Sequence, residues 1–408
     1  MLADSYFKEG HSFPNANFAR EYQHLVGSMA EYPKLAYGQR EVRRAGDLLT
    51  TKLAWPENRE KILEAFRIAN NWRDSHLYPM RSVRVSIAQR MRWQALKGYT
   101  AARPKRMTSI RKKLQRFTIN LEQINDIAGC RAVLDDMASV NALIEICENK
   151  FPHKIRQQYP YIKNPKSDGY RSHHIVFDFQ DGAEPDAFKG RRVEFQIRTR
   201  LQHSWATAVE AVGLYRGEDM KSGEGNPDWL RLFYLMSHEF AYAEKCETAS
   251  EVDRGVRLAE IRALNGKLGA ARVLEDLRNA THYLSTYLQE AARYYIIRYD
   301  NSTKQVSVTG YSDPFEASLM LARAEQRIEL GEDDAKVVLV EVGKIASLVE
   351  AYPNYFGDVA LFIRNLKHVC DGKEAIEFSM APQQLVAQRP RENPDFSAIR
   401  RRYTKWTY

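Results

Sequence analysis

The sequence predicts an α+β protein in which a mixed β-sheet is flanked by helices, with helical extensions and a small C-terminal α+β domain. Residues 172–179 and 192–198 alternate apolar and polar side chains, which is typical of half-buried strands. Residues 57–75 instead place apolar side chains at helical spacing. From residue 293 the predicted order is strand, strand, helix, strand, helix, and this order indicates the separate small domain.

Proline, glycine and capping residues set the expected limits of the N-terminal elements. Pro79 is expected to end the helix over residues 57–75, and Gly98 to cap the next helix in the left-handed conformation. Thr108 or Ser109 is suited to cap a short helix that begins near Ile110. The remaining expected elements of this half are helices over 83–97, 139–149, 200–214 and 227–246, a helical turn over 121–127, and strands over 129–134 and 153–159.

The C-terminal half is predicted to change character near residue 293. Residues 252–287 keep a helical spacing of apolar residues, with Gly266 and Gly269 as the expected break. Strands are then expected over 294–299, 305–309 and 336–342, and helices over 314–330 and 345–367. The predicted domains are a helical region (1–80), a central mixed domain (81–250), a helical connector (251–292), the small α+β domain (293–379) and a basic tail (380–408).

Composition excludes several classes of protein. At 408 residues with 44% hydrophobic side chains, the chain is long enough for two or three domains, and is not a disordered protein. Its four cysteines form no C-x-x-C pair, which favours reduced thiols over a disulfide framework or a zinc site. No apolar run approaches the ~18 residues of a membrane span, and the N-terminus lacks the apolar core of a signal peptide. We therefore expect a cytoplasmic protein without a membrane partner.

The charge distribution predicts an anion-binding site. The net charge is +9, and residues 81–116 contain twelve Lys or Arg and no Asp or Glu. Such a one-sided block is unfavourable unless it meets an anion. Within it, Arg103, Lys105, Ser109 and Lys113 are expected to converge around a helix N-terminus, whose free N–H groups attract phosphate.

Two carboxylates stand where they could share a magnesium ion. Asp126 precedes the predicted strand over residues 129–134, and Glu194 lies inside the strand over 192–198. If these strands are neighbours, both acids can bind Mg²⁺, which takes one or two carboxylates together with substrate phosphates. The sequence contains no P-loop, dinucleotide-binding, kinase, metallopeptidase or His-Asp hydrolase motif. Any polyphosphate chemistry must therefore use another architecture.

Four segments, in the same order, resemble the synthetase domain of the RelA/SpoT family. They are R-P-K-R-M-T-S-I-R-K-K (103–113), D-I-A-G-C-R (126–131), Y-I-K-N-P-K-S-D-G-Y-R-S-H-H (161–174) and E-F-Q-I-R-T (194–199). The resemblance covers residues 103–210 and implies a nucleotidyltransferase-like mixed sheet. It further implies an ATP-dependent pyrophosphokinase that moves the β,γ-pyrophosphate of ATP to the 3′-hydroxyl of GDP or GTP. Because no hydrolase motif is present, the chain is similar to the small synthetases that make the stringent-response alarmone (p)ppGpp.

The resemblance also implies a role for each matched residue on the ATP side. Arg103 and Arg131 would flank the adenine or the phosphates of ATP. Lys105, Ser109 and Lys113 would hold the ATP phosphates.

The resemblance implies that Asp126 and Glu194 bind Mg²⁺, and that Glu194 also activates the 3′-hydroxyl of the acceptor. Tyr170 would stack on the acceptor base, which needs a flat aromatic face. The acceptor-binding residues implied are Lys166, Tyr170, Arg171, His174, Gln196 and Arg198, with His203 and Glu210 on the following helix as further candidates.

The sequence leaves the identity of the pyrophosphate acceptor open. Pro160 and His173 depart from the family pattern on the acceptor side. Three functions remain: alarmone synthesis from ATP and GDP or GTP, a toxin-like pyrophosphorylation of the tRNA 3′-CCA end, or nucleotide binding without catalysis. The basic block and the Arg/aromatic tail suit tRNA phosphates, while the intact carboxylate pair argues against a pure binder. Oligomeric state is not readable from the sequence.

Overall fold

The computed structural model describes residues 32–51, 58–180, 187–216, 218, 220, 223–246, 253–280, 282–284, 292–300, 305–342 and 359–377. The chain divides into two compact units, Met1–Glu377 and Phe378–Tyr408, and every described residue belongs to the first. The predicted basic tail lies outside the described residues, as do residues 345–358 of the helix predicted over 345–367.

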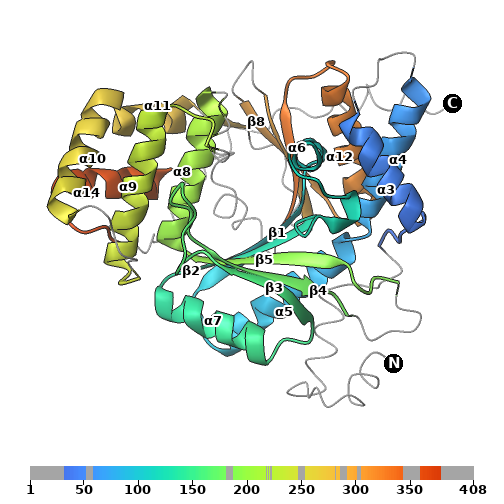
Figure 1. Ribbon diagram of the computed structural model, residues 1–408, viewed down its shortest axis with the longest axis horizontal. Coiled ribbons are helices and arrows are strands. Elements are labelled where there is room, and N and C mark those ends of the chain that lie inside the picture. Colours follow the sequence, from blue (N-terminus) through green and yellow to red (C-terminus); the bar gives the residue numbers. More distant parts are fainter. Residues whose placement is uncertain are drawn as a thin grey trace, which may run out of the picture. The chain divides into compact units, whose positions relative to one another are not determined.

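The described chain contains both helices and strands, with runs of consecutive helices before β1 and after β5 (Figure 1). The helices are α3 (Gln39–Thr50), α4 (Arg59–Asp74), α5 (Leu77–Trp93), α6 (Met107–Arg116), α7 (Met137–Asn149), α8 (Arg200–Arg216), α9 (Pro227–Ala243), α10 (Arg254–Leu268), α11 (Ala270–Ala280), α12 (Pro314–Glu329) and α14 (Ala360–Cys370), with the 3₁₀ turn η2 (Leu121–Gln123). The strands are β1 (Gly98–Pro104), β2 (Ala128–Leu134), β3 (Lys154–Pro160), β4 (His173–Asp178), β5 (Arg192–Thr199), β6 (His282–Leu284), β7 (Tyr294–Tyr299), β8 (Gln305–Tyr311) and β9 (Lys336–Val342).

The strands form a mixed sheet with the order β3-β4-β5-β2-β1-β9-β7-β8-β6. The pairs β2–β5 and β6–β8 are parallel and the other pairs are antiparallel. The predicted fold class, a mixed sheet flanked by helices, is confirmed.

The two faces of the β2–β4–β5 part of the sheet have different characters. Cys130, Ile175 and Phe195 point to one face, where they share a buried apolar core with residues of α5 and α7. Strand alternation places Arg131, His174 and Glu194 on the opposite face. A second buried core joins α8, α9, α10, α11 and α14. One face of the sheet is therefore built for packing, which leaves the other free for polar chemistry.

The prediction of a separate small domain over residues 293–379 is corrected by the sheet topology. Ala101 pairs with Val342 and Ala102 with Glu341, so β9 continues the sheet at the edge of β1. β7 pairs along the whole of β9, which brings β7 and β8 into the same sheet. The strands themselves lie where the sequence predicts them. The sequence does not predict that β9 pairs with β1, because residues 98–104 are not predicted as a strand.

The limits of α5 also differ from the prediction. α5 begins at Leu77, and Pro79 lies in its first turn, where an N–H has no intrahelical partner to lose. Ala95 takes the left-handed conformation after this helix, with φ of 52°. Gly98 instead opens β1, where a Cβ atom would lie 2.2 Å from the carbonyl oxygen of Val133. Gly98 is thus required by a close strand approach and is not a helix cap.

Two arginines of the acid-free block are structural. Arg81 and Arg84 on α5 both form ion pairs with Glu341 on β9, the second at 2.9 Å, and all three side chains are buried. The acid that neutralises this part of the block is therefore far away in the sequence. These two cations are not available to a phosphate ligand, which corrects the expectation that the whole block serves anion binding.

Replacement of Glu341 should be strongly destabilising. Glu341→Gln leaves two buried guanidinium groups without their carboxylate, which typically costs about 3–5 kcal/mol in the free energy of unfolding. Urea denaturation followed by circular dichroism measures this loss. Asp276→Asn, which removes the exposed Arg272–Asp276 pair, is the control and should leave the unfolding midpoint unchanged. An equal effect of both variants would show that the Glu341 pairs do not stabilise the fold.

Candidate active site

The polar face of the sheet brings several predicted site residues into register. Glu194 lies opposite Gly129 of β2, and Gln196 lies opposite both Arg131 of β2 and His174 of β4. In β1, Arg103 lies opposite Gly129. The strand that follows Asp126 and the strand that carries Glu194 are neighbours in the parallel β2–β5 pair, which meets the condition for a shared magnesium site.

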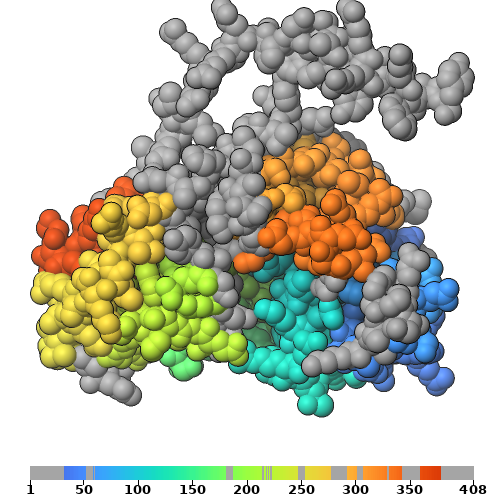
Figure 2. Space-filling model, turned by 90° about the horizontal axis from the view of Figure 1, so that it is seen from above, coloured from blue at the N-terminus to red at the C-terminus, as the bar shows by residue number. Residues whose placement is uncertain are grey.

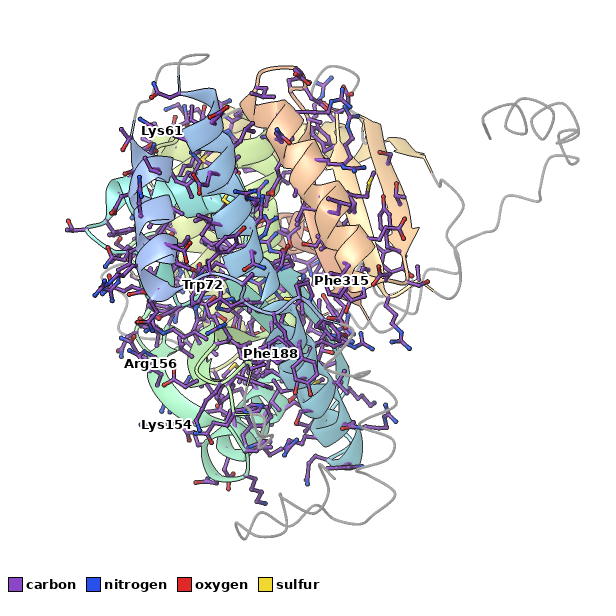
Figure 3. All side chains as sticks on the ribbon, turned by 90° about the vertical axis from the view of Figure 1, so that its right-hand side faces the viewer. Lys61, Trp72, Lys154, Arg156, Phe188 and Phe315 are labelled. Atoms are coloured by element: carbon purple, nitrogen blue, oxygen red, sulfur yellow. The ribbon has the colours of Figure 1, made fainter. Side chains whose placement is uncertain are left out.

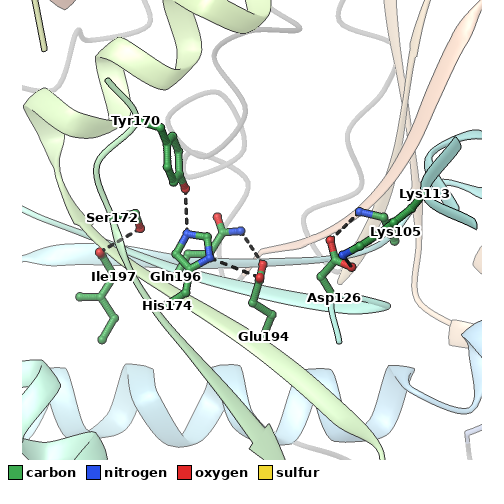
Figure 4. A network of polar contacts seen from close by, with 9 residues as sticks. All are labelled: Lys105, Lys113, Asp126, Tyr170, Ser172, His174, Glu194, Gln196 and Ile197. Carbon is green, nitrogen blue, oxygen red and sulfur yellow. Dashed lines mark hydrogen bonds and ion pairs between the residues drawn. The ribbon is translucent and has the colours of Figure 1, made fainter. Parts of the chain in front are cut away.

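Asp126 is held by two lysines from different elements (Figure 4). Lys105 Nζ lies 2.5 Å from Asp126 Oδ2, and Lys113 Nζ lies 2.9 Å from Asp126 Oδ1. Lys105 follows β1 and is fixed by its backbone N–H, which donates to the carbonyl of Ile127 at 2.8 Å. Lys113 reaches the same carboxylate from α6. The two lysines and the acid form a cluster with net positive charge, which suits an anionic ligand.

The protonation state of Asp126 follows from this cluster. Burial alone would raise its pKa, but the Lys105 and Lys113 ammonium groups more than offset it and lower the pKa of Asp126 to about 2. Asp126 is therefore a carboxylate throughout the physiological pH range.

A chain of hydrogen bonds runs from Tyr170 to Gln196 (Figure 4). The Tyr170 hydroxyl lies 2.9 Å from His174 Nε2, and His174 Nδ1 lies 3.3 Å from Glu194 Oε1. Gln196 Nε2 donates to Glu194 Oε2 at 2.7 Å. The phenol of Tyr170 is thus joined to the Glu194 carboxylate by a single imidazole.

The charges along this chain support one another. Burial would lower the pKa of His174, but Tyr170 and Glu194 raise it to about 9. Burial would raise the pKa of Tyr170, but His174 and Arg198 lower it to about 8. Burial likewise opposes ionisation of Glu194, yet its pKa is lowered because His174 and Gln196 donate hydrogen bonds to it. At neutral pH the His174 side chain is therefore an imidazolium beside an ionised Glu194.

The loop before β4 is fixed by short hydrogen bonds and by α9. The Tyr170 N–H donates to Asp168 Oδ1 at 2.8 Å, and the Gly169 N–H donates to the Lys166 carbonyl at 2.8 Å. Gly169 has φ of 90° and lies so close to α9 that a Cβ atom would be 3.1 Å from that of Ser237. Ser237 Oγ donates to the Gly169 carbonyl at 2.5 Å. Sequence analysis missed Ser237, because a serine inside a helix carries no signal of its partner.

Aromatic rings and a lysine surround Tyr170. Lys166 Nζ lies 4.8 Å from the ring centre of Tyr161 and 5.1 Å from that of Tyr170. Tyr161 stacks on Tyr159 with a centroid distance of 5.6 Å, and Trp205 lies 6.2 Å from Tyr170. Tyr161 was not among the predicted site residues, although it opens the segment that carries the family resemblance.

Three further predicted residues are buried around this loop. Arg171 donates to the carbonyl of Ile162 at 2.9 Å and to Ser237 Oγ at 3.3 Å, so it supports the loop from within. Arg198 lies 2.6 Å from His203 Nδ1, and burial and Arg131 lower its pKa to about 10. The structure thus brings Arg198 and His203 together, and Glu210 on α8 acts electrostatically on the same guanidinium.

Ser109 lies in the first turn of α6, half-buried, and Arg106 is the N-cap residue of that helix. α6 has no side-chain cap of its own, so the expectation that Thr108 or Ser109 caps it is wrong.

Asp126 and Glu194 form a donor set that fits a divalent cation together with a substrate. Both are ionised and half-buried, and the charge of Asp126 opposes the ionisation of Glu194, a repulsion that a cation would relieve. In the described part of the chain no group of three or more His, Cys, Asp and Glu residues is placed to hold a metal. Two carboxylates suit Mg²⁺ when substrate phosphates supply the remaining ligands.

Part of the chain is similar to known proteins. Residues 102–220 match a region found in RelA/SpoT proteins. The chain carries a RelA/SpoT region. The GTP pyrophosphokinase of Photobacterium angustum is 26% identical over 183 residues, which are 43% of this chain and 22% of that protein. The GTP pyrophosphokinase of Escherichia coli is 27% identical over 179 residues, again 22% of its length. The predicted resemblance is confirmed, although this chain spans only a small part of these relatives.

Among solved structures, small alarmone synthetase 1 of Bacillus subtilis bound to its product pppGpp is 23% identical, with a TM-score of 0.35, and the overlay covers 46% of this chain and 94% of that one. Small alarmone synthetase 2 of the same organism is 19% identical with a TM-score of 0.36, and the overlay covers 44% of this chain and 92% of that one.

Within the described residues of this protein, no helix has the length and apolar character needed to cross a membrane.

The pKa of His174 provides a test of the Tyr170–His174–Glu194 chain. Glu194→Gln removes a carboxylate that raises this pKa, so we expect it to fall from about 9 toward its ordinary value of 6.5. NMR titration of the imidazole measures the change. Glu148→Gln, which acts on the neighbouring His173 instead, is the control and should leave the His174 pKa in place.

A stability profile gives a second readout of the same bond. Because the folded-state pKa is raised, the contribution of His174 to stability is complete below pH 6.5 and is lost as the pH rises toward 9. The difference in unfolding free energy between the wild type and Glu194→Gln should shrink over that window. A His174 pKa near 6.5 in the wild-type protein would contradict the hydrogen-bond chain.

Proposed function

We propose that this protein is a transferase that moves the β,γ-pyrophosphate of ATP to the 3′-hydroxyl of GDP or GTP. The observation that carries the proposal is the juxtaposition of two differently built charge clusters on the polar face of the sheet. Asp126 with its two lysines suits the ATP phosphates, and Glu194 with His174 and Tyr170 suits the acceptor. The GTP pyrophosphokinases matched by the RelA/SpoT region support the same assignment.

On the donor side, Lys105 and Lys113 would exchange part of their contact with Asp126 for contacts with the phosphates. Both ammonium groups already converge on one point, so they need little reorganisation to meet a polyanion. Mg²⁺ held by Asp126 and Glu194 would supply charge neutralisation at the transferred phosphates. Arg103 and Arg131, on β1 and β2 beside these acids, complete the proposed ATP site.

On the acceptor side, the ring of Tyr170 would stack on the base, and Lys166, whose ammonium lies over that ring 5.1 Å from its centre, would turn to the acceptor phosphates. Glu194 is ionised and therefore able to take the proton of the 3′-hydroxyl. The 3′-oxygen then attacks the β-phosphorus of ATP, the bond from that phosphorus to the α–β bridging oxygen breaks, and AMP leaves. His174 holds the Glu194 carboxylate in place, and its positive charge keeps that carboxylate ionised.

The proposal is tested by offering alternative acceptors. The full-length protein is incubated with γ-labelled ATP, Mg²⁺ and one of GDP, GTP, ATP or deacylated tRNA. We expect label in the guanine nucleotides, released together with AMP. Label that reaches only tRNA would overturn the guanine-nucleotide acceptor. Label that reaches none of the acceptors would identify a nucleotide-binding protein without catalysis.

Glu194→Gln should reduce transfer by at least about a thousandfold, because loss of a catalytic base typically costs 10²–10⁴ and a proposed metal ligand is lost with it. Initial rates in the same assay measure the loss. Glu148→Gln, an exposed acid-to-amide change on α7, is the control and should retain the wild-type rate. Retained turnover of Glu194→Gln would remove this residue from its assigned role.

Tyr170→Ala should act mainly on the acceptor. Loss of one stacking ring typically weakens base binding by about 1–3 kcal/mol, so the KM for GDP or GTP should rise roughly fivefold or more. Tyr170→Phe keeps the ring and removes the hydroxyl that meets His174, so it should retain most of the acceptor affinity. Steady-state kinetics with each substrate varied in turn measures both. A larger effect of Tyr170→Ala on the KM for ATP would contradict the stacking role.

A further inference from the structure

The helix α6 begins at Met107 with an unusual partner. None of its own side chains caps the helix, and its N-cap residue is Arg106, whose side chain has no hydrogen-bond acceptor. The Met107 N–H instead donates to Glu325 Oε1 at 2.8 Å. Glu325 lies on α12, 218 residues further along the chain. A carboxylate at this end of a helix is favourable, because it satisfies a free N–H and opposes the helix dipole.

Glu325 is itself fixed by a second helix. Its Oε2 atom accepts from Arg73 Nη1 of α4 at 2.7 Å, and both side chains are buried. Figure 3 shows α12, which carries Phe315, beside the helix α4 that carries Trp72. The ion pair neutralises the carboxylate, and at 4% exposure Glu325 does not face solvent. Glu325 is therefore a fixed anchor and is not placed to bind a ligand.

In the sequence, the anchored residue Met107 lies between Lys105 and Lys113, the two lysines that hold Asp126. Lys105 is two residues before Met107, and Lys113 is six residues after it, about 9 Å along the helix. A shift at the start of α6 would move both ammonium groups relative to Asp126. Figure 2 shows the orange segment that contains α12 lying against the blue and blue-green segments that contain α4 and α6. The anchor thus connects the C-terminal part of the chain to the proposed ATP-phosphate cluster.

We propose that Glu325 is a positioning residue for the ATP side of the site: by holding the N-terminus of α6, it sets Lys105 and Lys113 at the distance from which both reach the donor phosphates. This inference rests on the proposed function. It assigns α12, which lies beyond the matched RelA/SpoT region, an indirect part in donor binding through the position of α6. Small displacements of phosphate-contacting groups have large effects on such sites, since about 1 Å can change a rate by a hundredfold.

Two substitutions of Glu325 in the full-length protein test this inference. Glu325→Ala removes the acceptor for the Met107 N–H, and we expect the Kd for a non-hydrolysable ATP analogue with Mg²⁺ to rise about fivefold to tenfold. Glu325→Gln keeps an acceptor oxygen for that N–H and should recover most of the affinity. The KM for the acceptor should change less than about twofold in both variants, because the Glu325 carboxylate accepts from Arg73 and from the start of α6, both outside the loop that carries Tyr170.

Calorimetric titration gives the Kd, and steady-state kinetics gives the two KM values. Asp333→Asn is the matched acid-to-amide control in the same segment. It breaks the pair with Arg298 away from α6, and it should leave ATP-analogue binding unchanged. The temperature of measurement is set below the unfolding transition of every variant.

The outcomes separate this inference from the proposed function. Wild-type protein that binds no ATP analogue would overturn the proposed function and this inference with it. Wild-type binding with equal affinity in Glu325→Ala would overturn only the positioning role. Equal rises in the KM for ATP and for the acceptor would mean that Glu325 acts on stability alone. If Glu325→Ala does not fold, the double variant Arg73→Met/Glu325→Met decides, because it removes both partners of the buried ion pair together with the acceptor for the Met107 N–H. An unchanged Kd for the ATP analogue in that variant would also overturn the positioning role.

Discussion

Buried guanidinium–carboxylate pairs hold the two halves of this chain together. Glu341 meets Arg81 and Arg84, and Glu325 meets Arg73, with all of these side chains removed from solvent. A buried charge is very costly unless its partner is in place, so these contacts tolerate little rearrangement. They join α4 and α5, which precede the RelA/SpoT region, to α12 and β9, which follow it. The sheet and the proposed donor site both depend on this arrangement.

Much of the local structure could be predicted from sequence. Apolar periodicity located β7, β9 and α8, and the left-handed Gly269 does divide the helical connector. Long-range pairing could not be predicted in the same way. β1 contains Arg103 and Pro104, which are poor strand signals, and so the strand that receives β9 was missed. An acid-free run of arginines gives no indication that its partner is Glu341.

The same difference between local and long-range contacts holds in the candidate site. Residues that share a short motif, such as Glu194 and Gln196, are placed together by strand alternation, which a sequence shows directly. The convergence of Lys105, Lys113 and Asp126 was expected in part, because two of them flank a predicted helix start. The supporting contacts were not: Ser237 and Glu325 reach the site from helices that are distant in sequence, and neither lies in a recognisable motif.

The pairing of β1 with β9 has a consequence for how the protein is made. Synthesis proceeds from the N-terminus, and β1 can gain its second neighbour only after residues 341 and 342 have been translated. Until then, the buried arginines of α5 lack their carboxylate and the start of α6 lacks its anchor. A growing chain that already contains the matched RelA/SpoT region therefore still lacks the contacts that order the segment carrying Lys105 and Lys113. The order of translation itself delays completion of the proposed site until residue 342 has been made.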